Sequence, residues 1–315
     1  MNKQRGLAII VTADDFGFGL RTSEGIIQAH RDGPVTATSM MTVTGDHAAA
    51  SADLLADAPA LEVGLHLVLT RCGHRPLVAT ASSGFADDDG FVGNGQLWIR
   101  AMTGGLDRRA VSDEIAAQAE LFRKLAGRAP AFVDAHHHAH QLPVIREALL
   151  DVIGQGLLPR ITRTTLEPPG WMRAIPGKRP RRCAAHFLGK RARTLFSRRG
   201  VWTNDFYFGM IEPRCLRSPG PWDPYIQRLP ETGVVEWVVH PGLPDETLRG
   251  RDLYIAERPL ELQRLTDSVN ALAWHHLRPF LTRKSAVAAH SAEREIAAPV
   301  PISYDPLLRR QCRSS

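Results

Sequence analysis

Short apolar runs alternate with helical patterns along most of this chain, and that alternation is the strongest constraint on its fold. Residues 7–12 (LAIIVT) form an unbroken apolar run rich in β-branched side chains, and similar runs recur at residues 35–43 and 61–69. Helical patterns separate them, one starting at Thr22 and one covering residues 47–55. Strands that are apolar on both faces are typical of parallel sheets covered by helices. The alternation therefore predicts an α/β fold with a mostly parallel sheet.

The same rhythm continues further along the chain. Residues 109–126 place apolar side chains at intervals of three and four, as an amphipathic helix does. Residues 70–94 are rich in glycine and aspartate and are expected to form a long surface loop. Further strands are predicted at residues 131–133, 157–163 and 233–242, and further helices at residues 143–153 and 260–272.

We expect one domain, because neither an internal repeat nor a linker interrupts the pattern. The predicted fold class is α/β, a single irregular (β/α) barrel with mostly parallel strands over residues 1–284. A basic insertion, part of it helical, is expected at about residues 168–200. Residues 285–315 are rich in alanine, serine and arginine without a sustained period, so we expect a poorly ordered tail.

The composition is that of a globular protein, with 43% hydrophobic and 23% charged residues. No apolar stretch approaches the roughly 20 residues that span a bilayer, and the run at residues 7–12 is too short for a signal peptide. The expected location is the cytoplasm, with peripheral contact to the inner membrane face as an extension. The four cysteines are scattered without a CxxC pair, which argues against a cysteine zinc site and for reduced thiols.

The formal net charge of +6 is concentrated in one segment. No acidic residue occurs between Glu167 and Asp205, whereas ten basic residues do: Arg173, Lys178, Arg179, Arg181, Arg182, Lys190, Arg191, Arg193, Arg198 and Arg199. Such a segment attracts phosphate, lipid headgroups or nucleic acid, or is simply a solvated insertion. We expect no nucleic acid, because no binding motif is present and the aromatic residues are not regularly interleaved with the basic ones.

Residues suited to metal chemistry follow four of the predicted strands. They are Asp14 and Asp15, then His66, then a cluster at residues 134–140 with four histidines, then His240. The carboxyl ends of parallel strands share one face, so these side chains should converge. One carboxylate and two imidazoles bind a divalent ion and leave positions open for water. With a carboxylate base and a histidine acid, the set suits metal-assisted hydrolysis of an amide or ester, and equally of a phosphoester.

Side-chain alternation along a strand leaves the exact ligands open. Asp14 and Asp15 should point in different directions, so that one binds metal while the other acts as base. His136 and His138 should share a face and are equally good ligands by geometry, with Asp134 on the same face to orient an imidazole. The remaining histidines of the cluster, His137 and His140, are expected to be structural or to face substrate.

Four motifs together resemble those of a known family. They are TADDFG at residues 12–17, GLHL at 64–67, DAHHHAH at 134–140 and VHP at 239–241. In this order they resemble the motifs of the YdjC-like carbohydrate deacetylases, over about residues 6–270. The resemblance implies an irregular (β/α) barrel with one bound divalent metal ion, and members of the family remove acetyl groups from N-acetylated sugars.

Carried over by motif, the resemblance implies Asp15, His66 and His136 as ligands, Asp14 as base and His240 as acid. Two histidines and one aspartate suit zinc, and magnesium, manganese and nickel also remain compatible. We further expect four residues to contact substrate: Arg160, His137, Asn204 and Asp205.

Two branches of the family are each similar to part of the chain. The segment at residues 204–209 (NDFYFG) and the basic residues before it resemble the hopanoid biosynthesis-associated branch, whose implied substrate is an N-acetylglucosaminyl hopanoid lipid. The triple histidine resembles the chitooligosaccharide branch, since the hopanoid branch tends to carry lysine where His137 stands. The expected partners are thus an N-acetylated sugar or glycolipid, an anionic membrane surface and a second copy of the chain in a homodimer.

Overall fold

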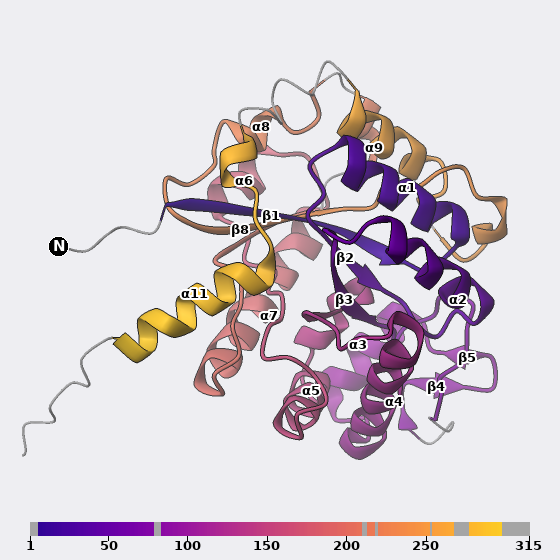
Figure 1. Cartoon of the computed structure of the whole chain (residues 1–315). Coiled ribbons are helices and arrows are strands. Elements are labelled where there is room, and N and C mark those ends of the chain that lie inside the picture. Colours follow the sequence, from indigo (N-terminus) through magenta and orange to yellow (C-terminus); the bar gives the residue numbers. More distant parts are fainter. Residues whose placement is uncertain are drawn as a thin grey trace, which may run out of the picture.

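A curled sheet of parallel strands forms the centre of the molecule (Figure 1). The computed structural model describes residues 6–78, 83–209, 213–217, 220–252, 254–267 and 277–297. The sheet order is β6-β3-β2-β1-β8-β7, and each of its pairings is parallel. The strands are β1 (Leu7–Phe16), β2 (Ala37–Met40), β3 (Glu62–Leu67), β6 (Val133–Ala135), β7 (Phe206–Phe208) and β8 (Gly233–Val239).

Two isolated bridges extend the sheet beyond β6. Val133 pairs with Thr162, and Ile161 pairs with Trp202, which lies shortly before β7 at the opposite edge. The sheet therefore curls into an incomplete, irregular barrel. The prediction of an α/β fold with a mostly parallel sheet is confirmed, whereas residues 157–163 contribute bridges instead of a full strand.

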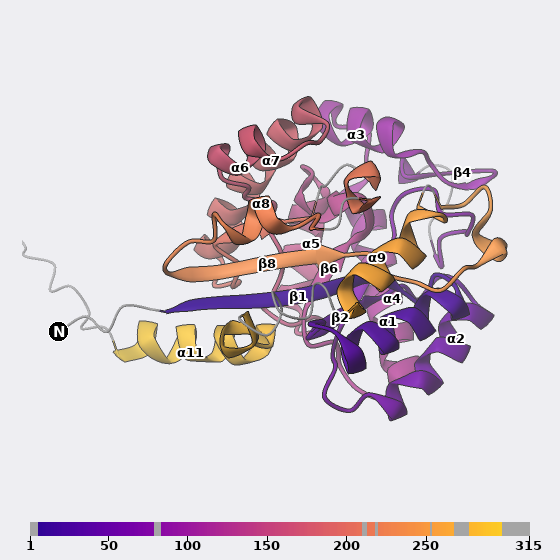
Figure 2. The ribbon, with the colours of Figure 1, turned by 90° about the horizontal axis from the view of Figure 1, so that it is seen from above.

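Helices cover the sheet on both sides: in Figure 2, where β1 and β8 run across the picture, α6 and α7 lie on one side and α1 and α2 on the other. None of the described helices is long and apolar enough to cross a membrane. Their bounds are α1 (Leu20–Asp32), α2 (Asp46–Asp53), α3 (Asn94–Thr103), α4 (Arg108–Ala126), α5 (Ile145–Gly154), α6 (Pro169–Ala174), α7 (Arg179–Arg198), α8 (Asp223–Ile226), α9 (Glu257–Thr266) and α11 (Lys284–Ala297).

Two local expectations differ from the structure. The segment at residues 70–94 includes a hairpin of β4 (Ala86–Asp87) and β5 (Gly90–Phe91), because Phe85 and Phe91 are buried and stack with ring centroids 6.4 Å apart. The last predicted helix, at residues 260–272, is α9, which starts earlier and ends at Thr266. Residues 268–276 lie outside the described part of the chain.

The basic segment is not a solvated insertion, because α7 packs one face against the rest of the fold. Ala185, Leu188, Ala192 and Phe196 are buried along that face. Gly189 lies on the same face, where a Cβ atom would meet the Gln141 side chain and the amide and hydroxyl of Thr165 at about 3 Å. The basic residues are therefore held at fixed positions on a packed helix.

The C-terminal segment is also ordered further than the sequence predicts. Residues 284–297, most of which belong to the expected tail, form α11, and Figure 2 places this helix beside the first half of β1. The Thr282 amide donates to the Ile9 carbonyl at 2.9 Å, along a stretch of β1 that precedes its pairing with β2. The Glu62 carboxylate accepts from the first two helical amides, those of Lys284 and Ser285. Residues 298–315 lie outside the described part of the chain.

Candidate metal centre and active site

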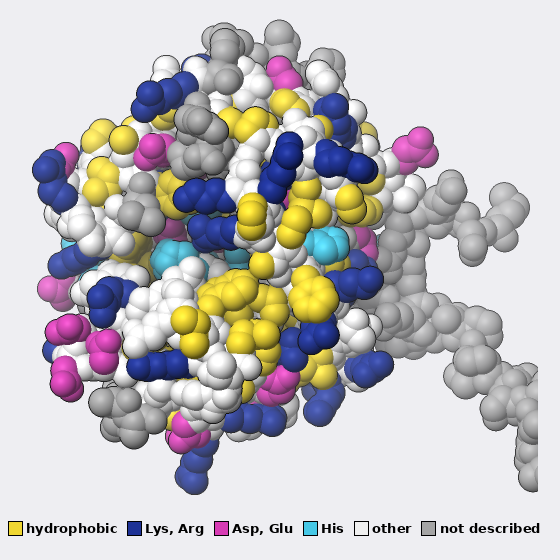
Figure 3. All heavy atoms as spheres, turned by 180° about the vertical axis from the view of Figure 1, so that it is seen from behind, with side chains coloured by type: hydrophobic (Ala, Val, Ile, Leu, Met, Phe, Trp, Pro, Cys, Tyr) yellow, Lys and Arg dark blue, Asp and Glu magenta, His cyan; other side chains and the backbone are white. Residues whose placement is uncertain are grey.

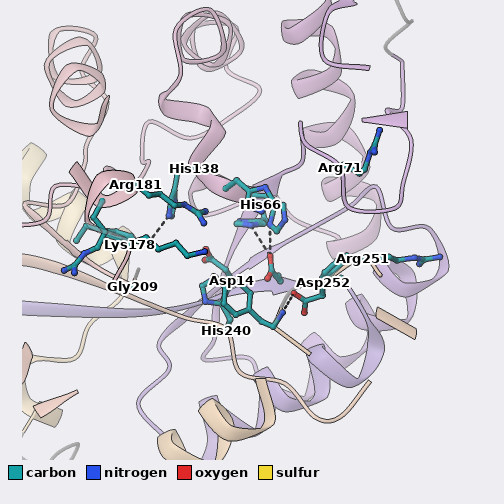
Figure 4. Close-up of a pocket in the computed structure, with 17 residues that line it drawn as sticks. Asp14, His66, Arg71, His138, Lys178, Arg181, Gly209, His240, Arg251 and Asp252 are labelled. Atoms are coloured by element: carbon teal, nitrogen blue, oxygen red, sulfur yellow. Dashed lines mark hydrogen bonds and ion pairs between the residues drawn. The ribbon is translucent and has the colours of Figure 1, made fainter. Parts of the chain in front are cut away.

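The carboxyl ends of the strands open into one cavity of about 360 Å³ (Figure 4). β1 contributes Asp14 and Asp15, β3 contributes His66, and β7 contributes Tyr207. Other residues of its wall are Phe18, Arg71, His136, His137, His138, Lys178, Arg181, Arg182, Gly209, His240, Arg251, Asp252 and Tyr254. Residues that are far apart in the sequence thus converge, as the position of their strand ends predicts.

An irregularity at the end of β1 brings both aspartates to this cavity. The register of β1 against β2 shifts between Ala13 and Phe16. Within this shift Asp15 has a φ of 70°, a left-handed conformation that costs free energy for residues other than glycine. The strand therefore does not continue regularly through Asp14 and Asp15, and both carboxylates reach the cavity.

Asp15, His66 and His136 form a group whose geometry fits one metal ion. The Asp15 Oδ1 atom lies 3.3 Å from His66 Nε2 and 3.2 Å from His136 Nδ1. Ligand atoms about 2.1 Å from a common ion lie roughly 3.0 to 3.5 Å apart. One atom from each of the three residues lies within 4.8 Å of the others. Two nitrogens and one oxygen suit zinc and leave coordination positions open.

Asp134 orients His66 from the side away from this group. Its Oδ1 atom lies 2.6 Å from His66 Nδ1, so Nε2 is directed toward Asp15. Although burial opposes the charged imidazolium, the carboxylates of Asp14 and Asp134 raise the pKa of His66 to about 10. A carboxylate behind a histidine fixes its tautomer and increases its strength as a ligand. Asp134 thus orients an imidazole, as expected, but that of His66.

Arg258 occupies the other oxygen of Asp15. Its guanidinium donates to Asp15 Oδ2 at 2.6 Å and to Asp252 Oδ2 at 2.5 Å. Burial raises the pKa of Asp15, but Arg258 and the two histidines outweigh it and hold that pKa well below its usual range. Asp15 is therefore ionised, with Oδ1 turned toward the histidines.

Arg163 holds Asp14 in a forked ion pair. Both terminal nitrogens donate to the Asp14 carboxylate, each at 2.7 Å, and one of them also lies 2.7 Å from Asp134 Oδ2. Arg163 overcomes the effect of burial and lowers the pKa of Asp14. Asp14, His66 and Asp134 form a second group of possible metal ligands, but the guanidinium already occupies both carboxylates. The group with Asp15 is the better fit.

The histidine cluster is a 3-10 segment, η3 (His136–Gln141), because β6 ends at Ala135. The expected alternation of His136 and His138 is therefore wrong. His138 has a φ of 58° and its Nε2 lies 3.1 Å from the Tyr207 hydroxyl, away from the group with Asp15. The structure favours His136 over His138 as the histidine beside Asp15 and His66.

The two other histidines of the cluster differ in position. His137 lines the cavity, and its Nδ1 lies 2.9 Å from the Thr70 hydroxyl. His140 is buried and its Nε2 contacts the Arg163 carbonyl at 2.9 Å. Burial lowers the pKa of His140 to about 4 and that of His137 well below its usual range, so both are neutral. His140 is thus buried and is not among the residues that line the cavity, whereas His137 is.

His240 approaches the cavity from the end of β8. Its backbone amide donates to the Glu261 carboxylate at 2.8 Å, and its ring stacks on Tyr254 with centroids 5.7 Å apart. Figure 4 shows His240 next to Asp14, on the side of the cavity away from His66. A histidine and a carboxylate therefore flank the region in front of the candidate metal group.

Three residues expected to contact substrate lie elsewhere. Arg160 is exposed and donates to the Arg199 carbonyl. The buried Asn204 side chain bonds the backbone of residues 164 and 206, and Asp205 pairs with Arg193 and accepts from the Val234 amide. None of these side chains is among those that line the described cavity.

Several residues that line the cavity or hold its side chains were not predicted from the sequence. Arg163 ends the run at residues 157–163, at the position where other strands end in site residues, so a signal existed. Tyr207 lies within the motif at residues 204–209. Arg258 comes from a helix, α9, and no pattern in the sequence connects it with Asp15.

Comparisons with known proteins identify the family. The YdjC-like protein family matches residues 8–274. Chitooligosaccharide deacetylases of Yersinia pestis and Yersinia pseudotuberculosis are each 34% identical over 265 residues, which is 82% of this chain and 90% of theirs. A crystal structure from Enterococcus faecalis, described as a cellobiose-phosphate cleavage protein, superposes with a TM-score of 0.72 at 22% identity and covers 90% of this chain and 98% of its own. This chain belongs to the YdjC-like protein family.

Proposed function

We propose that this protein is a metal-dependent hydrolase that removes the acetyl group from an N-acetylated amino sugar. The observation that carries the proposal is the group of Asp15, His66 and His136, with Asp14 and His240 beside it in one cavity. The relatives named chitooligosaccharide deacetylase support the reaction and the class of substrate.

Each side chain has a place in such a reaction. A divalent ion bound by Asp15, His66 and His136 would polarise the acetyl carbonyl and acidify water. Asp14 accepts the proton of the attacking water, and Arg163 holds its carboxylate ionised and in position. His240 donates a proton to the amine nitrogen that leaves. Zinc and magnesium are the proposed ions, and zinc fits the two imidazoles better.

An assay of acetate release from N-acetylglucosamine oligomers, with metals varied, tests the reaction. Asp15→Asn and His136→Asn should lose metal binding and acetate release together. His138→Asn is the matched control in the same segment, and it should keep metal affinity within about threefold, since its ring contacts Tyr207 instead. Full acetate release by metal-free Asp15→Asn, or phosphate release from phosphoesters without acetate release, would exclude the proposal.

An apolar groove beside the cavity supports a glycolipid as substrate. This groove, of about 390 Å³, lies between α3 and α7, and it shares His137, His138 and Arg181 with the cavity. Its other lining residues are Asn94, Gly95, Trp98, Gln141, Ala184, Ala185 and Leu188. Figure 3 shows histidines and basic side chains in a hollow of this face, with hydrophobic side chains next to them. We propose that the sugar enters the cavity and that an apolar aglycone of hopanoid type lies in the groove.

A variant that fills the groove tests whether the substrate is a glycolipid or a short oligosaccharide. Ala184→Trp should raise KM for an N-acetylglucosaminyl lipid about tenfold, because a buried aglycone would be excluded. KM for N-acetylchitobiose should stay within about twofold. Equal effects on both substrates would place sugar units in the groove instead.

Basic residues of α7 are proposed to contact an anionic membrane that presents this lipid. Arg179, Lys190 and Arg191 are exposed on the helix, and each basic residue near an anionic surface contributes about 1 kcal/mol. Reversal of all three charges should abolish binding to phosphatidylserine vesicles. Unchanged vesicle binding would exclude the membrane contact but would not count against the proposed deacetylation.

A further inference from the structure

A lysine outside the matched family region reaches the interior of the curled sheet. Lys284 is the first residue of α11 and is fully buried, whereas the family match ends at residue 274. Its Nζ atom lies 2.5 Å from Glu236 Oε1 and 3.9 Å from Asp134 Oδ2. The same atom lies 3.7 Å from the centre of the Phe132 ring, a favourable position for a cation.

The backbone around Lys284 is anchored on both sides. Leu281 bridges to Ile9, and the Thr282 amide donates to the Ile9 carbonyl. The Lys284 amide donates to Glu62 at 2.7 Å, so a carboxylate caps the start of α11. The side chain of Lys284 therefore enters the sheet from the end opposite the cavity, at a fixed position.

An unbroken chain of ion pairs connects Lys284 with the candidate active site. Glu236 accepts from Arg163 Nε at 2.7 Å, both terminal nitrogens of Arg163 donate to Asp14, and one of them also forms an ion pair with Asp134. Asp134 in turn orients His66. All of the charged side chains in this chain are buried: the carboxylates of Asp14, Asp134 and Glu236 and the cations of Arg163 and Lys284.

We propose that Lys284 is a positioning residue for the active site, acting through Glu236 and Arg163. With Lys284 in place, two cations balance the three carboxylates. Lys284 pairs with Glu236, and Arg163 pairs with Asp14 and Asp134 as well as with Glu236. Without it, three buried carboxylates compete for one guanidinium, and Glu236 draws Arg163 away from Asp14 and Asp134. Asp14 then loses its alignment and Asp134 holds His66 less firmly. The C-terminal helix is thus part of the catalytic architecture.

Lys284→Met removes the charge and keeps most of the volume, and Arg283→Met is its matched control. Arg283 is the exposed neighbour of Lys284 on the same segment. Lys284→Met should weaken metal affinity, measured by calorimetry, about tenfold, as changes behind a ligand do. It should also lower kcat for acetate release about tenfold or more, with KM within about twofold. Arg283→Met should change none of these quantities. The kcat part rests on the proposed function, whereas metal affinity does not.

The double variant Lys284→Met/Glu236→Gln keeps the test decisive if the single variant does not fold. It leaves no unpaired carboxylate, so metal affinity and kcat should return to within about threefold of the parent values. Lys284→Arg should likewise retain both. A double variant as impaired as Lys284→Met would overturn the route through Glu236. A lower melting temperature with unchanged metal affinity and kcat would overturn the proposal and leave Lys284 a packing residue. A parent protein that binds metal but releases no acetate would count only against the proposed function.

Discussion

At the scale of single residues, the site depends on how its buried carboxylates are shared among arginines and histidines. Asp134 holds His66, Asp14 pairs with Arg163, and Asp15 is divided between Arg258 and the histidines. The motifs in the sequence lead to the two aspartates and to His66 and His136. They do not lead to the arginines, because the value of a buried cation depends on which carboxylates the fold places around it.

The raised pKa of His66 makes metal binding depend on pH. Burial opposes the imidazolium form, yet Asp14 and Asp134 raise the pKa of His66 to about 10. Without metal, both ring nitrogens of His66 are therefore protonated at neutral pH. A ligand nitrogen must lose that proton, so metal affinity should increase about tenfold per pH unit between pH 7 and 9. Calorimetry in buffers of different ionisation enthalpy should show release of about one proton per ion. Affinity that is constant over this range would contradict the prediction.

The sequence predicts a substrate contact for Arg160, whereas the structure places Arg160 outside the cavity and Arg163 beside Asp14. One conservative variant of each arginine tests this difference. Arg163→Lys cannot reproduce the fork to Asp14 together with the ion pairs with Asp134 and Glu236. We expect kcat to fall at least about a hundredfold, which corresponds to about 2.7 kcal/mol. Arg160→Lys should leave kcat and KM within about twofold, since this side chain is exposed and outside the cavity. Equal losses in both variants would contradict the structure.

At the scale of elements, the sequence patterns predicted which segments form strands and helices, but not where each strand ends. The unbroken apolar run in β1 and the spacing in α4 were sufficient, because each reflects burial along a whole element. The turn after β6 was not predictable, since His137 and His138 adopt left-handed conformations that only their surroundings justify. The packing of the basic segment was left open for a related reason: α7 carries many charges, and its apolar face is narrow.

Close packing of α7 on η3 leads to a prediction for two glycines. A Cβ atom at Gly189 would lie 2.9 Å from Gln141 Oε1 and 3.0 Å from the Thr165 amide. Gly189→Ala should therefore lower the free energy of unfolding by about 1 to 3 kcal/mol, and it should displace the basic residues at the cavity. In α5, Gly154 has nothing within 4 Å of such an atom, so Gly154→Ala should be neutral or stabilising by up to about 1 kcal/mol. Urea denaturation of both variants measures the difference, and equal stabilities would contradict close packing of α7.

At the scale of the whole molecule, the sheet order explains why distant motifs meet. Parallel strands in the order β6-β3-β2-β1-β8-β7 place the ends of β1, β3, β6 and β8 around one opening. This convergence could be predicted from the sequence, because it follows from alternation and from the direction of parallel strands. The contribution of α11 could not, because its segment shows no sustained pattern and is ordered through contacts with Ile9 and Glu62.

Metal binding should stabilise the whole fold, because the three proposed ligands come from separate elements. Asp15, His66 and His136 approach one another only in the folded chain. An ion that binds the native state alone at a concentration 100 times its Kd raises the free energy of unfolding by about 2.7 kcal/mol. Thermal unfolding with zinc or magnesium and with a chelator should show this difference for the parent protein. It should disappear in His136→Asn and persist in His138→Asn, whose ring contacts Tyr207. A metal effect that survives His136→Asn would place the ion elsewhere, since this histidine supplies one of only two nitrogens in the group.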